Sequence, residues 1–146
     1  MAITKVLARG WTLEVNTGTE AEPEFTPIGG INTFTFSNSK NDADITDFDS
    51  EGYMEHMVAS RSFEISMEGF YLEDLATGDR DAGQEKVEEY GSLVGEDSLR
   101  TYRLTTPGGT VKTFLASTTI GDQGGGNDDP TSWGATLTVS GQITTT

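Results

Sequence analysis

Apolar and polar residues alternate with a period of two along much of this chain, the pattern of β-strands whose two faces meet different surroundings. The clearest case is residues 59–71, ASRSFEISMEGFY. One face of this segment carries Phe63, Ile65, Met67 and Gly69, and the other carries Ser62, Glu64, Ser66 and Glu68. We therefore expect a strand with one buried side and one side facing water.

The same alternation predicts further strands at residues 11–16, 31–37, 99–105, 111–117 and 131–143. The third and fourth of these flank Thr106-Pro107-Gly108-Gly109, whose Pro and Gly suit a tight reversal, so they should form a hairpin. The apolar positions are Trp11, Leu13 and Val15 in the first segment, Phe34 and Phe36 in the second, and Trp133, Ala135, Leu137, Val139, Gly141 and Ile143 in the last.

One helix is expected between the two groups of strands. Asp81 can cap its start, with Gln84 three residues later in the spacing of a capping box, and Gly95 can end it. The apolar stripe comprises Val87, Tyr90, Gly91 and Val94, with Glu85, Glu88 and Glu89 mainly on the opposite side. The fold expected is mainly β, a β-sandwich or barrel with one flanking α-helix.

Three segments have the composition of exposed loops: residues 18–27, 38–58 and 121–130. The last, GDQGGGNDDP, combines glycine with like charges and is expected to be a flexible acidic loop. The middle one is long for a hairpin connection, and it carries Ile45, Phe48, Tyr53, Met54 and Met57. Apolar residues at that density in a loop favour docking on another molecule, so we interpret residues 38–58 as a long assembly loop between subunits.

Length and composition favour a single domain over residues 1–146, with residues 1–10 as a short N-terminal arm. Hydrophobic residues make up 34% of the chain, so a core can form but would gain from burial against neighbouring copies. The chain has no cysteine, which excludes disulfides and thiol nucleophiles. No stretch approaches the roughly 18 apolar residues of a membrane span, and the N-terminus lacks a secretory pattern, so we expect no membrane contact.

Charge argues against direct binding of nucleic acid. Nine Lys and Arg stand against 24 Asp and Glu, giving a formal net charge of −15. Because phosphate binding depends on clustered cations, the average surface should repel DNA. The acidic, lysine-poor composition also fits adaptation to high salt, an interpretation that concerns the habitat and leaves the function open.

The sequence contains no motif that would support catalysis or a bound cofactor or metal. Asp47, Asp49, Glu51 and Gly52 match the opening of a calcium-binding loop, but Val58 stands where the twelfth-position Glu is needed. The GGGND run resembles one fragment of the calcium-binding repeats that bind metal by stacking several copies, but it occurs only once, so a flexible acidic loop is the favoured interpretation. His56 is the only histidine, and no GxSxG elbow or phosphate-binding glycine loop occurs. We therefore expect no catalytic, cofactor-binding or metal-binding residues.

The order of these parts resembles the major tail tube protein of long-tailed, siphovirus-like viruses of bacteria or archaea. Residues 28–71, then one helix, a hairpin and a final strand ending near Ser140-Gly141 follow the order of that family. Ile45-Thr46-Asp47 and Asp49-Ser50-Glu51-Gly52-Tyr53, preceding the strand that ends in Met67-Glu68-Gly69, are the segments most similar to it. The resemblance covers residues 25–146, and neither the 121–130 loop nor the N-terminal arm matches it.

This resemblance implies a structural subunit of a virion tail, assembled in the host cytoplasm into stacked, hexameric rings that enclose a channel for genome delivery. Residues 38–58 would reach a neighbouring subunit, with Ile45, Phe48, Tyr53, Met54 and Met57 as contact candidates. Glu64 and Glu68 are candidates for the lumen, where an acidic wall would let DNA pass without binding. The implied partners are identical copies, a tape-measure protein, and tail terminator and baseplate proteins.

Two other functions compete with this hypothesis. An Ig-like or carbohydrate-binding β-sandwich module of a surface protein fits the glycine-rich loops and the tryptophans, and it should remain a monomer at high concentration. A carboxylate-based hydrolase would lose its activity when one particular Asp or Glu is neutralised.

Overall fold

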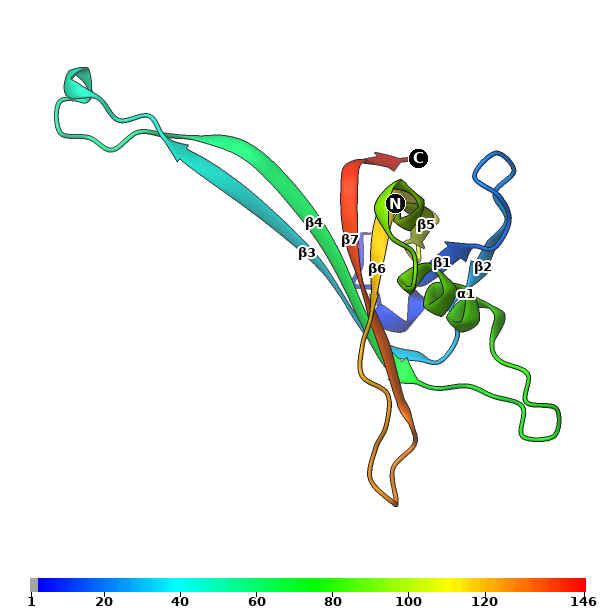
Figure 1. Cartoon of the computed structure of the whole chain (residues 1–146). Helices are drawn as coiled ribbons and strands as arrows, with labels where there is room; N and C mark the ends of the chain where they lie inside the picture. Colours follow the sequence, from blue (N-terminus) through cyan, green and yellow to red (C-terminus); the bar gives the residue numbers. More distant parts are fainter. Residues whose placement is uncertain (1–2) are drawn as a thin grey trace.

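The computed structural model describes residues 3–146, and they form one antiparallel sheet of seven strands with one α-helix (Figure 1). The strands are β1 (Thr12–Asn16), β2 (Phe25–Pro27), β3 (Ile31–Asp44), β4 (His56–Phe70), β5 (Arg100–Thr105), β6 (Val111–Ile120) and β7 (Ser132–Thr145). Their order across the sheet is β2-β1-β5-β6-β7-β4-β3. The helix α1 spans Ala82–Gly91, and short 3-10 turns lie at Ala8–Gly10, Phe48–Ser50 and Gly95–Ser98.

The hydrophobic core lies on one face of this sheet, and the sheet curls around it. The alternation seen in the sequence is confirmed: Ile65 and Met67 of β4 are buried, whereas Glu64 and Glu68, which flank them, are exposed. Trp11, beside one end of the sheet, lies 5.6 Å from Phe34 of the opposite edge strand, measured between ring centroids. The two ends of the sheet therefore meet over a shared core, and the expected mainly β, sandwich-like fold with one flanking helix is confirmed.

Helix α1 packs on the core side, where Val87 and Tyr90 are buried. Asp81 caps it as expected, accepting a hydrogen bond from the backbone N–H of Gln84 at 3.1 Å. The expected C-terminal end is wrong: the helix stops at Gly91, and Val94 lies beyond it, 83% exposed. The chain turns after Gly91 so that Leu93, rather than Val94, packs against the core.

Glycine is required where α1 meets the sheet. A Cβ atom at Gly91 would lie 2.6 Å from a side-chain carbon of Ile120. This close approach places the helix directly on β6.

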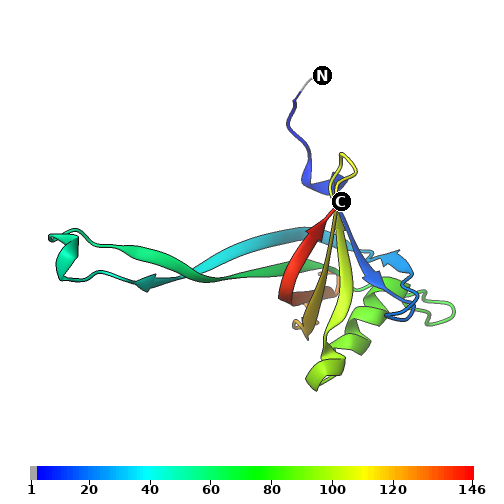
Figure 2. The ribbon, with the colours of Figure 1, turned by 90° about the horizontal axis from the view of Figure 1, so that it is seen from above.

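The segment interpreted as a long loop is mostly a β-hairpin. Strands β3 and β4 pair outward to Asp44 and His56, with a register shift between Asn41 and Asp42, so only residues 45–55 connect them. The pairing of β4 with β7 begins at Glu64, so residues 38–63 form a two-stranded ribbon, called the arm below, that projects far from the body (Figures 1 and 2). Sequence alternation missed the outer parts of these strands, residues 38–44 and 56–58, because a ribbon with water on both faces has no buried side to require apolar residues.

The other expected loops and the N-terminal arm are partly confirmed. Residues 18–24 form an exposed turn, and Phe25–Pro27 adds a short edge strand beside β1. The 121–130 segment is exposed, with one bridge between Gly124 and Ser132. Residues 1 and 2 of the N-terminal arm lie outside the described residues, and residues 3–7 are irregular and exposed. Within residues 3–146, none of the helices has the length and apolar character needed to cross a membrane.

The inner end of the β3–β4 hairpin, called the root of the arm below, depends on a close backbone contact at Gly69, six residues inward from the arm itself. A Cβ atom there would lie 2.0 Å from the carbonyl oxygen of Gly30, so Gly69→Ala forces β3 and β4 apart. We predict a loss of about 3 kcal/mol or more in the free energy of unfolding, measured by urea denaturation of the monomer. As a matched control, Gly108→Ala, whose new Cβ would have its nearest neighbour at 4.0 Å, should change it by less than about 0.5 kcal/mol. Equal effects of the two substitutions would contradict the contact.

Candidate assembly surfaces

The distal end of the arm carries apolar side chains that nothing in the folded chain covers. The candidate residues Ile45, Phe48, Tyr53, Met54 and Met57 are all exposed, and so is Val58, which the sequence analysis did not include. Phe48 is 105% exposed and thus makes essentially no contact with its own chain. Such an exposed apolar cluster lowers the solubility of the free monomer and favours burial of these side chains against another molecule.

The connection at this end, residues 45–55, is called the tip below, and it is an ordered loop. The Thr46 hydroxyl bonds both backbone groups of Glu55, accepting from its N–H at 2.8 Å and donating to its carbonyl oxygen at 3.1 Å. Asp47 Oδ1 accepts from the N–H of Asp49 and from the Ser50 hydroxyl, which closes the 3-10 turn that presents Phe48. A preorganised tip loses less conformational entropy when it binds.

The tip region is also strongly anionic. Residues 41–60 contain six acids, Asp42, Asp44, Asp47, Asp49, Glu51 and Glu55, and no Lys or Arg. Hydrogen bonds from the side chain and the backbone N–H of Thr46 lower the pKa of Asp44. This carboxylate therefore stays ionised to a lower pH than a free Asp side chain. Apolar and anionic side chains therefore occupy the same small surface.

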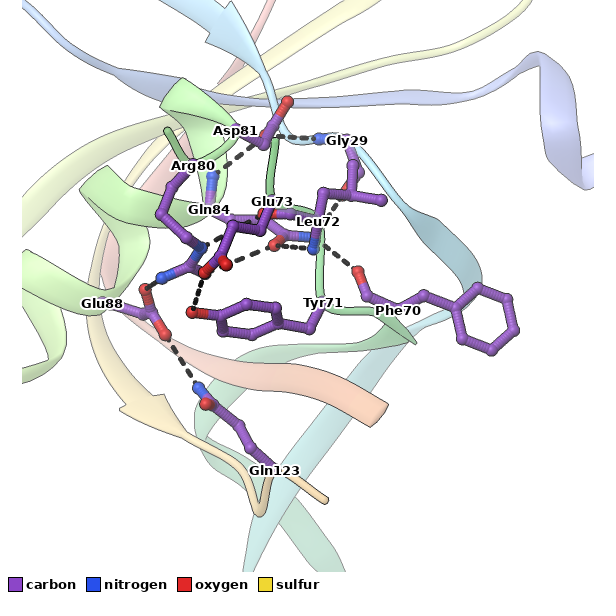
Figure 3. Close-up of polar contacts among 10 residues, drawn as sticks. All are labelled: Gly29, Phe70, Tyr71, Leu72, Glu73, Arg80, Asp81, Gln84, Glu88 and Gln123. Atoms are coloured by element: carbon purple, nitrogen blue, oxygen red, sulfur yellow. Dashed lines mark hydrogen bonds and ion pairs between the residues drawn. The ribbon is translucent and has the colours of Figure 1, made fainter. Parts of the chain in front are cut away.

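A single buried amide holds the root of the arm (Figure 3). Gln84 of α1 is fully buried, and its Nε2 donates to the carbonyl oxygens of Gly29, two residues before β3, and Phe70, the last residue of β4. These distances are 2.9 Å and 2.7 Å, and Gln84 Oε1 accepts from the N–H of Leu72 at 3.1 Å. The capping-box spacing of Gln84 thus pointed to the correct residue but to a different role, because its side chain holds the arm instead of the helix start.

Around this amide, an ion pair fastens two loops to α1. Arg80 pairs with Glu88 at 2.7 Å and stacks over the ring of Tyr71 at 3.9 Å from its centroid, and Gln123 donates to Glu88 at 2.8 Å (Figure 3). Partial burial alone would raise the pKa of Glu88, but the bonds from Arg80 and Gln123 outweigh it and hold the pKa below its usual value. The segments after β4 and after β6 are therefore both held against the helix.

The sheet face opposite the core is rich in hydroxyl and carboxylate groups. Glu64 and Glu68, the lumen candidates, are exposed on this face. Their cross-strand neighbours are Ser37 and Thr138 for Glu64, and Thr33 and Gly134 for Glu68. The face therefore presents small polar groups with two acids, and it lies on the side of the sheet away from α1.

A groove at the base of the arm is a feature that the sequence analysis missed. It has a volume of about 670 Å³ and lies between the arm and the outer half of β7. Its lining includes Phe36, Arg61, Phe63, Lys112, Val139 and Ile143. The signal was present in the sequence, because Arg61 falls on the same face as Phe63 in the alternation of β4 and interrupts an apolar series.

No family model and no curated protein matches this chain. Three similar solved structures align over almost all of it. A chain in the tail of an empty gene transfer agent particle, computed with helical refinement and C6 symmetry, has a TM-score of 0.76 at 17% identity, covering 97% of this chain and 99% of that chain. A chain in the virion of a native gene transfer agent particle has a TM-score of 0.71 at 15% identity, with the same coverage.

The third is a chain in the baseplate of an anti-feeding prophage, determined with six-fold symmetry. Its TM-score is 0.60 at 10% identity, covering all of this chain and 97% of that chain. The likeness runs from end to end in all three cases, so it includes the arm as well as the body. At these identities it establishes a shared fold.

The Gln84 amide should be critical for stability. In Gln84→Ala the carbonyl groups of Gly29 and Phe70 and the N–H of Leu72 lose their partner in a partly buried setting. We predict a loss of about 2–4 kcal/mol in the free energy of unfolding, together with faster amide hydrogen exchange at the root of the arm. The control Gln123→Ala, which removes an exposed bond to Glu88, should cost less than about 1 kcal/mol. A Gln84→Ala protein as stable as this control would show that the amide does not hold the root.

Proposed function

We propose that this chain is a structural subunit of a phage-like tail tube that forms stacked rings, six subunits to a ring, around a channel for genome delivery. The observation that carries the proposal is the end-to-end likeness to chains in tail and baseplate assemblies, two of which were determined with six-fold symmetry. In this role the chain acts mechanically, and no catalytic residue is required. Its location is the tail of the virion, after assembly in the host cytoplasm.

The arm supports this function physically. A two-stranded ribbon has only marginal stability in water, and this one also exposes a large apolar cluster at its tip. If the tip is buried on a neighbouring subunit, that subunit both supports the ribbon and covers its apolar side chains. Ile45, Phe48, Tyr53, Met54 and Met57 are accordingly proposed as inter-subunit contacts.

The polar face of the sheet suits the wall of a channel. Glu64 and Glu68 project from a surface of short hydroxyl side chains, and a wall with negative charge and few cations repels phosphate. DNA would then slide through without lasting contacts. A tape-measure protein inside the tube, and tail terminator and baseplate proteins at its ends, are the further partners proposed.

The apolar tip gives the first test of assembly. Phe48→Asp should leave a folded monomer by circular dichroism, because the side chain contacts nothing in its own chain, while it abolishes tubes in negative-stain images. Phe48→Leu, which keeps an apolar side chain, should still assemble. Unchanged tubes from Phe48→Asp would exclude the tip as the contact. A wild-type protein that stays monomeric at millimolar concentration would instead favour an Ig-like or carbohydrate-binding module.

The charge of the lumen gives a second test. In tubes assembled from Glu64→Lys/Glu68→Lys chains, two charges per subunit change sign on the proposed wall, and double-stranded DNA should be retained in a salt-dependent manner. Asp122→Lys/Asp128→Lys chains carry the same net charge with the change placed in the 121–130 loop. DNA retention should be measured by co-sedimentation with sheared tubes, whose open ends admit DNA. Equal retention by the two variants would contradict a lumen lined by Glu64 and Glu68.

A further inference from the structure

The groove at the base of the arm concentrates positive charge on a chain that is otherwise strongly acidic. Lys40 and Arg61 are directly opposite each other across β3 and β4, and Lys112 of β6 lies over the Phe36 ring at 5.1 Å from its centroid. Among residues 3–146, none of these three cations takes part in an ion pair, whereas Arg80, Lys86 and Arg103 do. Arg61 and Lys112 therefore line the groove with no neutralising partner among the described residues, and Lys40 lies beside it as the cross-strand neighbour of Arg61.

This arrangement is unfavourable in the isolated chain. Like charges at directly opposed positions of an antiparallel pair destabilise it, and here the pair is the two-stranded arm, which has no third strand to support it. An anionic group bound in the groove would convert this repulsion into attraction. The geometry thus favours an acidic ligand.

The groove is also apolar, which restricts the ligand further. Phe36 and Phe63 form an aromatic pair with ring centroids 6.0 Å apart, and Val139 and Ile143 of β7 are half-buried beside them. A polyanion such as DNA would satisfy the cations but leave this surface uncovered. A peptide segment with both carboxylates and large apolar side chains would satisfy both.

The tip of the arm has that composition. It combines Phe48, Tyr53 and Met54 with the carboxylates of the anionic 41–60 region, and all three apolar side chains are exposed. The acidic loop at residues 121–130, by contrast, has carboxylates but no large apolar side chain. Charge and apolar surface of the tip are therefore complementary to those of the groove.

The tip cannot reach the groove of its own chain. The arm runs about nine residues outward from Asn38 to Asp47, and at about 3.3 Å per residue the tip lies about 30 Å away from the groove along a paired ribbon. The partner must therefore be another copy.

We propose that the tip of one copy binds in the cationic, apolar groove of the next copy. This inference deepens the proposed function and rests on it, because the tip meets this groove only where copies assemble. The two surfaces differ, so the contact is heterologous and propagates from copy to copy, closing a ring or extending a filament.

Charge reversal tests the pairing. Arg61→Glu/Lys112→Glu in the groove, or Asp49→Lys/Glu55→Lys in the tip, should each raise the concentration needed for tube formation at least about tenfold, since like charges then face each other. A chain with all four substitutions should assemble like the wild type. The matched control combines Arg61→Glu/Lys112→Glu with Asp122→Lys/Asp128→Lys, which restores the same net charge of −15 without restoring the pairing, and it should not assemble. Equal rescue by both combinations would overturn the proposal.

Cross-linking locates the contact and separates this proposal from the proposed function. Because the chain has no cysteine, Met54→Cys and Gln142→Cys place single thiols at the tip and beside the groove, both at exposed positions. With a short bis-maleimide, the doubly substituted chain should give a ladder of oligomers on a denaturing gel, and either single variant alone should not extend beyond dimers. The charge-reversal test applies only to variants that circular dichroism shows to be folded. If they do not fold, the cross-linking ladder alone tests the contact.

Each outcome is decisive. Tubes without a ladder would overturn the tip-in-groove contact and leave the tube function standing. A ladder without tubes would support the contact and contradict the tube. The absence of both would contradict the two proposals together. Binding of a double-stranded oligonucleotide that Arg61→Glu/Lys112→Glu abolishes, without a ladder, would overturn the proposal in favour of a nucleic-acid site.

Discussion

The β3–β4 hairpin, whose outer part is the arm, is anchored to the body of the protein at its inner end, where helix α1 holds both strands. Gln84 bonds the carbonyl groups of Gly29 and Phe70, one from each strand of the hairpin, and so ties both strands to α1. The close approach of Gly69 to Gly30 keeps the strands together at the same place. A buried amide with all its partners in place rigidifies what it joins, and the inner end of the hairpin is consequently fixed to the body of the protein.

The body of the fold was predictable from sequence because burial imposes a period on the residues. Ile65 and Met67 alternate with Glu64 and Glu68 because one side of β4 faces a core, and Asp81 marks a helix start because its carboxylate can cap one. The outer arm has no such pattern, since neither of its faces is buried in the chain, and residues 38–44 therefore had the composition of a loop. The exposed residues of the tip were identified through composition alone, and their contact with another subunit stays a prediction.

The groove and the root were missed for a different reason. Both are made by residues distant in sequence, such as Arg61 of β4 with Lys112 of β6, or Gln84 of α1 with Gly29, and no local spacing brings these together. The end of α1 was misplaced because the pattern continued to Val94, whereas the turn after Gly91 selects Leu93 for the core. Helical periodicity selected Val94 as the buried residue, but tertiary packing buries its neighbour Leu93 instead.

Assembly of a chain with a net charge of −15 must overcome repulsion between like-charged copies. At physiological ionic strength the Debye length is about 8 Å, so distant charges are largely screened and local contacts decide the balance. With Arg61 and Lys112 in one groove, and carboxylates with Phe48 at the far end of the arm, the proposed contact would be locally attractive while the overall charge stays negative. The same separation leaves the polar face of the sheet, with Glu64 and Glu68, free of these cations, so one acidic composition can serve both an adhesive contact and a non-adhesive wall.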